Sequence, residues 1–79
     1  MRTKLELWMM RNDVTTNRLW RLMKELRPGV SRTTVENIVK GRSVPRPSTA
    51  QDISAITGGY LTPDDVLRHV IETRGRGGA

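Results

Sequence analysis

The sequence has no cysteine and no phenylalanine, and aromatic residues occupy only 4% of its 79 positions. Without cysteine, the chain can form neither a disulfide framework nor a thiolate metal site, and this composition fits a reducing cytoplasm. Because two tryptophans and one tyrosine are the only aromatic residues, the core must consist mainly of leucine, isoleucine, valine and methionine.

Long apolar runs are also missing. A membrane-spanning helix needs about 18 consecutive apolar residues, and no segment approaches that length. We expect no signal peptide at the N-terminus, because Glu6 and Arg11 interrupt its apolar stretch. The sequence therefore predicts a cytoplasmic protein with no membrane partner.

Catalytic constellations are a third absence. His69 is the only histidine, no pair of carboxylates suggests a catalytic pocket, and no glycine-rich segment has the spacing of a phosphate loop. We expect no enzymatic activity, no metal and no cofactor. We also expect His69 to be a surface or interface residue.

The sequence does contain helical periodicity. Apolar residues recur at i, i+3 and i+4 in five segments, and no long alternating strand pattern occurs. We predict one all-α domain over residues 1–73, with helices at about residues 3–12, 15–27, 31–40, 48–57 and 62–73. Residues 74–79 are predicted to form a disordered basic tail.

Hydroxyl residues mark the predicted helix starts, because their side chains can accept hydrogen bonds from first-turn N–H groups. The candidates are Thr3, Thr15 or Thr16, Ser31, Ser48 or Thr49, and Thr62. The segment from Val44 to Pro47 is expected to be an extended connector, since two prolines in three residues exclude a helix. The predicted apolar faces of the first four helices contain Leu5, Trp8, Met9, Leu19, Trp20, Leu22, Met23, Leu26, Val35, Ile38, Val39, Ala50, Ile53 and Ile56, and the apolar stripe of the fifth helix contains Val66, Leu67, Val70 and Ile71.

The positive charge is concentrated in one part of the chain. The formal net charge is +6, and the segment from Arg18 to Arg46 carries all of this excess, with Glu25 and Glu36 as its only acids. A patch of one sign suits a polyanion, although a solvated face with no partner would have the same composition.

The third predicted helix lies inside this basic segment. Its apolar stripe faces inward, and Gly41 is placed to end it. Its other face offers hydrogen-bonding side chains with cations at both ends, as a helix entering the DNA major groove requires. Glu36 could accept from a cytosine, or it could link Arg32 and Lys40. The base-reading candidates are Arg32, Thr33, Thr34, Glu36 and Asn37.

The stretch G-V-S-R-T-T-V-E-N-I-V-K-G-R-S-V-P-R-P, from Gly29 to Pro47, resembles part of the λ-repressor-like helix-turn-helix family, the Cro/repressor or XRE type. In that family a hydroxyl residue such as Ser31 caps the recognition helix, and a glycine followed by a cation ends it. The later A-I-T-G-G-Y-L-T-P-D-D-V-L is similar to the family's last two helices. The resemblance implies a five-helix fold and a small, phage-type regulator in a bacterial or phage-infected bacterial cell.

One spacing departs from the family. The interval from Thr16 to Ser31 is longer than usual, and this predicts an extra turn in the second helix or a longer loop after it. N–H groups at the start of the second helix, together with polar residues around the third, are expected to hold the DNA backbone. The phosphate-binding candidates are Thr15, Thr16, Asn17, Arg18, Ser31, Lys40, Arg42, Ser43 and Arg46.

We therefore predict a sequence-specific double-stranded DNA-binding transcriptional regulator, a repressor or autorepressor acting on a pseudo-palindromic operator. One recognition helix reads too few base pairs for a genome, so we also predict a homodimer. The alternatives are an antitoxin that binds both a toxin partner and DNA, and a nonspecific nucleic-acid-binding protein. The predicted dimer interface comprises Tyr60, Leu61, Val66, Leu67, Val70 and Ile71, unless the last helix folds fully onto its own core.

Overall fold

The computed structural model describes residues 2–77, with side chains described up to residue 75. All regular secondary structure within these residues is helical, which confirms the prediction of an all-α fold with five helices. No helix in this part of the chain combines the length and the apolar character needed to cross a bilayer. The helices are α1 (Lys4–Arg11), α2 (Thr16–Leu26), α3 (Arg32–Val39), α4 (Pro47–Ile56) and α5 (Pro63–Gly77).

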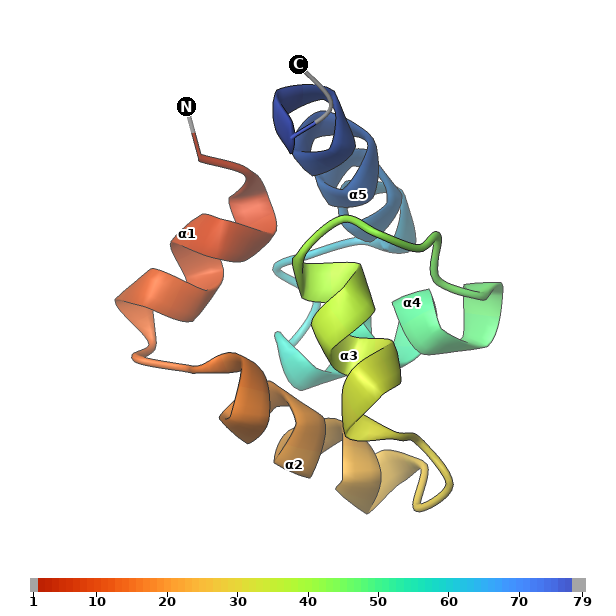
Figure 1. Cartoon of the computed structure of the whole chain (residues 1–79). Helices are drawn as coiled ribbons and strands as arrows, with labels where there is room; N and C mark the ends of the chain where they lie inside the picture. The colour runs from red at the N-terminus through yellow and green to blue at the C-terminus, as the bar shows by residue number, and fades with distance from the viewer. Residues whose placement is uncertain (1, 78–79) are drawn as a thin grey trace.

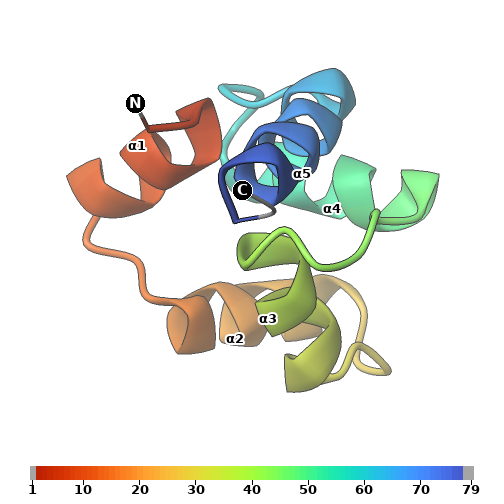
Figure 2. The same cartoon turned by 45° about the horizontal axis from the view of Figure 1, so that its top comes forward.

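The helices surround one core. Figure 1 shows α1 and α5 side by side near the two ends of the chain, with α3 near the centre and α2 below it. α4 packs against both α5 and α2. In the view of Figure 2 the C-terminal end of α3 lies beneath α5. The buried apolar side chains are Leu5, Met9, Leu19, Met23, Val35, Ile38, Ala50, Ile53, Leu61, Val66 and Val70.

Most predicted core positions face this cluster. Trp8 and Trp20 pack against it half-buried, and the indole N–H of Trp20 donates to the carbonyl of Val30 at 3.2 Å. The prediction for Leu26 is wrong, because 54% of its surface is exposed. Leu26 is the last residue of α2, where the chain turns away into the loop before α3.

Hydroxyl caps begin α1, α2 and α3 as predicted. Thr3 forms a capping box with Glu6 at the start of α1, and Thr15 caps α2 by accepting from the N–H of Arg18 at 3.1 Å. Ser31 caps α3 by accepting from the N–H of Thr34 at the same distance. The local pattern of hydroxyl residue followed by apolar stripe therefore predicted these three starts correctly.

The start of α4 differs from the prediction. Neither Ser48 nor Thr49 is the cap, because the helix already begins at Pro47 and Arg46 occupies the N-cap position. Proline is well suited to the first helical position, since its missing N–H has no partner there and its φ angle is already helical. Of the four residues of the predicted connector, Val44, Pro45 and Arg46 therefore lie outside a helix and Pro47 lies inside α4.

α5 begins where the sequence predicts, but it ends later than predicted. Thr62 and Asp65 cap each other: the Asp65 N–H donates to Thr62 Oγ1 at 3.2 Å and the Thr62 N–H donates to Asp65 Oδ2 at 3.0 Å. The helix continues through Gly77, so a tail beginning at Arg74 is wrong for residues 74–77. Arg74 is bonded to carbonyls of the loop after α3, and this contact extends the packed part of the helix. Residues 78–79 of the predicted tail lie outside the described residues.

The prediction for His69 is wrong, because this side chain is only 1% exposed. Its Nε2 lies 2.9 Å from the carbonyl of Val39, and its Nδ1 lies 2.6 Å from Thr3 Oγ1. Histidine can be buried when both ring nitrogens find partners, and here they do. His69 thus connects α5 to the end of α3 and to the cap of α1.

Candidate nucleic-acid interface

α3 has one buried face and one open face. Val35 and Ile38 are buried in the core, which attaches the helix to the rest of the molecule. The five predicted base-reading residues lie on the remaining surface of α3. Arg32, Thr33 and Thr34 are exposed, and Glu36 and Asn37 are half-buried.

The hydroxyls at the start of α3 are partly engaged. Ser31 Oγ accepts from the Thr34 N–H and lies 2.8 Å from Thr34 Oγ1. Each hydroxyl oxygen keeps additional hydrogen-bonding capacity, and both residues are exposed. Ser31 and Thr34 therefore present polar hydroxyl groups to solvent at the start of α3.

Glu36 forms an ion pair with Lys40 on the same helix, with 2.7 Å between Lys40 Nζ and Glu36 Oε1. The hydrogen bond and charge of Lys40 lower the pKa of the Glu36 carboxyl, and Arg32 and Arg42 lower it further. Of the two roles open for Glu36, the structure has the link to Lys40. The same pair makes Lys40 a less available cation than its exposure alone would indicate.

The first turn of α2 presents backbone donors. Thr15 caps the helix, while the N–H groups of Thr16 and Asn17 lie in the first turn, where an α-helix supplies no acceptor. Arg18 is exposed beside them. This arrangement has the positive end of a helix dipole and a cation at one point, which favours an anion.

The loop after α3 is tied back to that helix. Gly41 has a φ of +74°, a conformation that favours glycine. The Arg42 N–H donates to the carbonyl of Asn37 at 2.7 Å, and the Ser43 N–H approaches the same oxygen at 3.4 Å. Arg42 is exposed and Ser43 is half-buried, so both are held close to the C-terminal end of α3.

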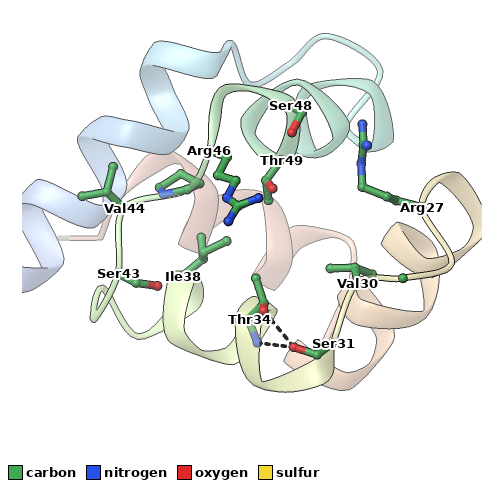
Figure 3. Close-up of a pocket in the computed structure, with 12 residues that line it drawn as sticks. Arg27, Val30, Ser31, Thr34, Ile38, Ser43, Val44, Arg46, Ser48 and Thr49 are labelled. Atoms are coloured by element: carbon green, nitrogen blue, oxygen red, sulfur yellow. Dashed lines mark hydrogen bonds between the residues drawn. The ribbon is translucent and has the colours of Figure 1, made fainter.

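A groove of about 530 Å³ runs between the start of α3, the connector after it and the start of α4. Figure 3 shows the Arg46 side chain reaching into this groove from the connector. At its edge, Arg27 pairs with Asp52 of α4 at 2.7 Å, and this carboxylate raises the pKa of the Arg27 guanidinium. Neither the groove nor this ion pair was predicted from the sequence. The two partners of the ion pair are 25 residues apart, so no local pattern joins them.

The basic residues therefore divide into two groups. Arg27 and Lys40 have acidic partners, and Lys24 lies over the Trp20 ring at 5.0 Å from its centroid. The cations that form no salt bridge within residues 2–77 include Arg18, Arg32, Arg42 and Arg46. These four come from α2, α3 and the loop that joins α3 to α4, which leaves a net positive surface around the open face of α3.

Of the six residues predicted to form the dimer interface, three are buried in the core and three are exposed. Leu61, Val66 and Val70 are buried within the chain itself, so their assignment to an exposed interface is wrong. α4 and α1 pack against α5 and cover that side of the helix. The other three residues are open to solvent: Tyr60 is 43% exposed, Leu67 39% and Ile71 61%.

Comparison with known proteins gives no further assignment, because no family model, no curated protein and no solved structure matches the chain.

Proposed function

We propose that the chain is a sequence-specific double-stranded DNA-binding transcriptional regulator in which α2, the following turn and α3 act as a helix-turn-helix of the λ-repressor-like type. The observation that carries the proposal is the open face of α3. It offers Arg32, Thr33 and Asn37 to solvent while Val35 and Ile38 fix the helix to the core. A rigidly mounted helix with short polar side chains fits the major groove.

Base recognition is assigned to side chains with suitable donors and acceptors. Arg32 can present two donors to a guanine, and Asn37 can pair bidentately with an adenine. Thr33 can contact a thymine methyl. Glu36 is assigned to orienting Lys40, with which it is paired.

Backbone contacts are assigned to the cations around α3 that form no salt bridge with the described residues. The first turn of α2 and Arg18 would meet one phosphate, and Arg42 and Arg46 would meet the strand beyond the end of α3. The groove beside Arg46 leaves room for that side chain to turn toward a strand. As a regulator, the protein acts by occupying a promoter site and excluding polymerase, which requires no catalytic chemistry.

We further propose that the protein reads a pseudo-palindromic operator as a homodimer, with the exposed part of α5 as the contact between protomers. Two recognition helices double the number of base contacts and fix the spacing of the half-sites at about one helical turn. Exposed apolar residues at an i, i+4 spacing, such as Leu67 and Ile71, are suited to helix-to-helix contact.

Selection of duplexes from a random pool tests the function directly. We expect a shared motif with two-fold symmetry among the selected sequences. Recovery of unrelated duplexes with equal affinity would instead support nonspecific nucleic-acid binding and contradict the proposal.

The base-reading assignment is tested with Arg32→Ala and Asn37→Ala on the selected duplex. Each change should cost about 1–3 kcal/mol of binding free energy on the cognate site and much less on random DNA. Arg11→Ala, which removes one exposed cation from α1, is the matched control and should leave both affinities nearly unchanged. Equal losses on cognate and random duplexes would assign Arg32 and Asn37 to the backbone and not to bases.

A further inference from the structure

The C-terminal end of α3 is attached to α5 by three consecutive contacts. His69 Nε2 lies 2.9 Å from the carbonyl of Val39, the last residue of α3. Thr73 lies against Gly41, and the Arg74 guanidinium contacts the carbonyl oxygens of Gly41 and Arg42. His69 and Thr73 lie about one turn apart along α5 and Arg74 follows Thr73 directly, and Figure 2 shows this part of the helix over the end of α3.

The backbone of Gly41 approaches α5 too closely for any side chain. A Cβ atom at this position would lie 2.7 Å from Thr73 Cβ and 3.2 Å from the Arg74 backbone nitrogen. The φ of +74° is a second reason for glycine here. This contact fixes the separation between the end of α3 and α5.

Arg74 completes the attachment with hydrogen bonds to two carbonyls. Its Nη2 donates to the Arg42 carbonyl at 3.1 Å, and its Nε lies 3.4 Å from the Gly41 carbonyl. A cation at this place also faces the negative end of the α3 dipole. On the other side of the same loop, the Arg42 N–H donates to the Asn37 carbonyl at 2.7 Å. The peptide groups around Arg42 are therefore held between α3 and α5.

We propose that Arg74 is a positioning residue for DNA binding, acting through the loop after α3. By holding the carbonyls of Gly41 and Arg42, it fixes the direction in which the Arg42 side chain leaves the loop. The Arg42 side chain itself is exposed and forms no salt bridge within residues 2–77, so the loop backbone determines where its charge lies. The consequence for DNA rests on the proposed function, whereas the consequence for the loop does not.

The first experiment needs no DNA. Amide hydrogen exchange is measured on the free full-length protein for the wild type, Arg74→Ala and the charge-matched control Arg11→Ala. Arg74→Ala should speed the exchange of the Arg42 and Ser43 amides by about tenfold, because the loop opens more often. In Arg74→Ala, the amides of α2 should exchange at wild-type rates. In Arg11→Ala, the Arg42 and Ser43 amides should also exchange at wild-type rates. An unchanged Arg42 amide in Arg74→Ala would overturn the proposal, whatever the protein binds.

The second experiment separates positioning from direct contact with a phosphate. On the selected duplex, Arg74→Ala should weaken binding about tenfold in the wild-type background and have little further effect when Arg42→Ala is already present. Independent, additive losses would show that Arg74 meets the DNA itself and would overturn the positioning role. If no duplex is selected, the proposed function fails while the exchange result still stands.

A third variant guards against loss of the fold. Arg74 is exposed, so we expect Arg74→Ala to remain folded. If it does not, Arg74→Gln replaces it in both experiments, because a glutamine keeps a side-chain donor of similar reach but removes the charge. Loop protection in Arg74→Gln should then lie below that of the wild type, because one amide group replaces two guanidinium donors, and full wild-type protection would contradict the hydrogen-bonding role.

Discussion

His69 holds three helices together through one ring. A backbone carbonyl can only accept, so the contact with Val39 requires a proton on Nε2. Its Nδ1 lies 2.6 Å from the Thr3 hydroxyl oxygen, which also accepts from the Glu6 N–H at 3.1 Å. The cap of α1 and the end of α3 are therefore joined through the imidazole ring of His69 on α5.

Replacing His69 by Leu should lower the free energy of unfolding by about 2–4 kcal/mol. Leucine fills similar space, but it leaves the Val39 carbonyl and the Thr3 hydroxyl without their buried partner. Urea unfolding measures the change. His69→Gln can keep the bond to Val39 and His69→Asn the bond to Thr3, so each should recover part of the loss. A His69→Leu protein as stable as the wild type would show that the network contributes nothing.

Asp65 links stability to pH at the start of α5. The hydrogen bond from the Thr62 backbone is the main reason why the pKa of Asp65 is lowered, and Lys4, 3.2 Å away, lowers it as well. Because the folded pKa lies below the unfolded one, the charge stabilises the fold at neutral pH. This contribution is lost as the pH falls through the folded pKa.

Asp65→Asn should accordingly be less stable than the wild type at pH 7, by up to about 1 kcal/mol. The two proteins should become equally stable once the Asp65 carboxyl is protonated in acid. Thermal unfolding across the acid range tests this, with Asp64→Asn as the neighbouring control. A difference that stays constant with pH would show that the charge is not the cause.

Contacts such as those of His69 could not be predicted from sequence, because they join residues far apart in the chain. Thr3 and His69 are 66 positions apart, and Arg74 and Arg42 are 32 apart. A hydroxyl cap is different, since its donor lies three residues away and the pattern is visible locally. Ser31 was therefore predicted correctly, whereas the partners of His69 and Arg74 depend on how α5 docks.

The start of α4 combines a weak cap with a proposed DNA contact. Arg46 has φ −66° and ψ 155°, the extended conformation of an N-cap, but its side chain makes no capping hydrogen bond. A serine in this conformation could accept from a first-turn N–H group. Stability and DNA binding therefore place opposite demands on this position.

Arg46→Ser should raise the free energy of unfolding by about 0.5–1 kcal/mol and weaken DNA binding at the same time. Arg46→Ala removes the same cation without supplying a cap, so it should weaken binding with no gain in stability. Urea unfolding and duplex titration on the three proteins measure both effects. If Arg46→Ser binds DNA as tightly as the wild type, Arg46 is not a phosphate contact.

How the helices pack decides which part of α5 can meet a partner. The helical period predicted a wide apolar stripe, but it could not show which side α1 and α4 would cover. The structure buries Val66 and Val70 and leaves Leu67 and Ile71 in the open. Helix existence and periodicity were thus available from the sequence, while the division between core and surface required the docked arrangement.

This division decides which variant can test the proposed dimer. Val70→Asp would place a charge in the core and unfold the chain, so the informative variant is Ile71→Asp, on the exposed side. In sedimentation at micromolar concentration we expect a wild-type dimer whose dissociation constant rises at least about tenfold in Ile71→Asp, because the new charge lies in an apolar contact. Met10→Asp, the same kind of change at an exposed position of α1, should leave the assembly intact.

DNA binding provides a second test of the dimer. The affinity of Ile71→Asp for a single half-site should be unchanged, while its affinity for the paired half-sites should fall, since only binding to paired half-sites depends on two protomers binding together. A wild-type monomer that binds one per operator would contradict the dimer and leave Leu67 and Ile71 without this role.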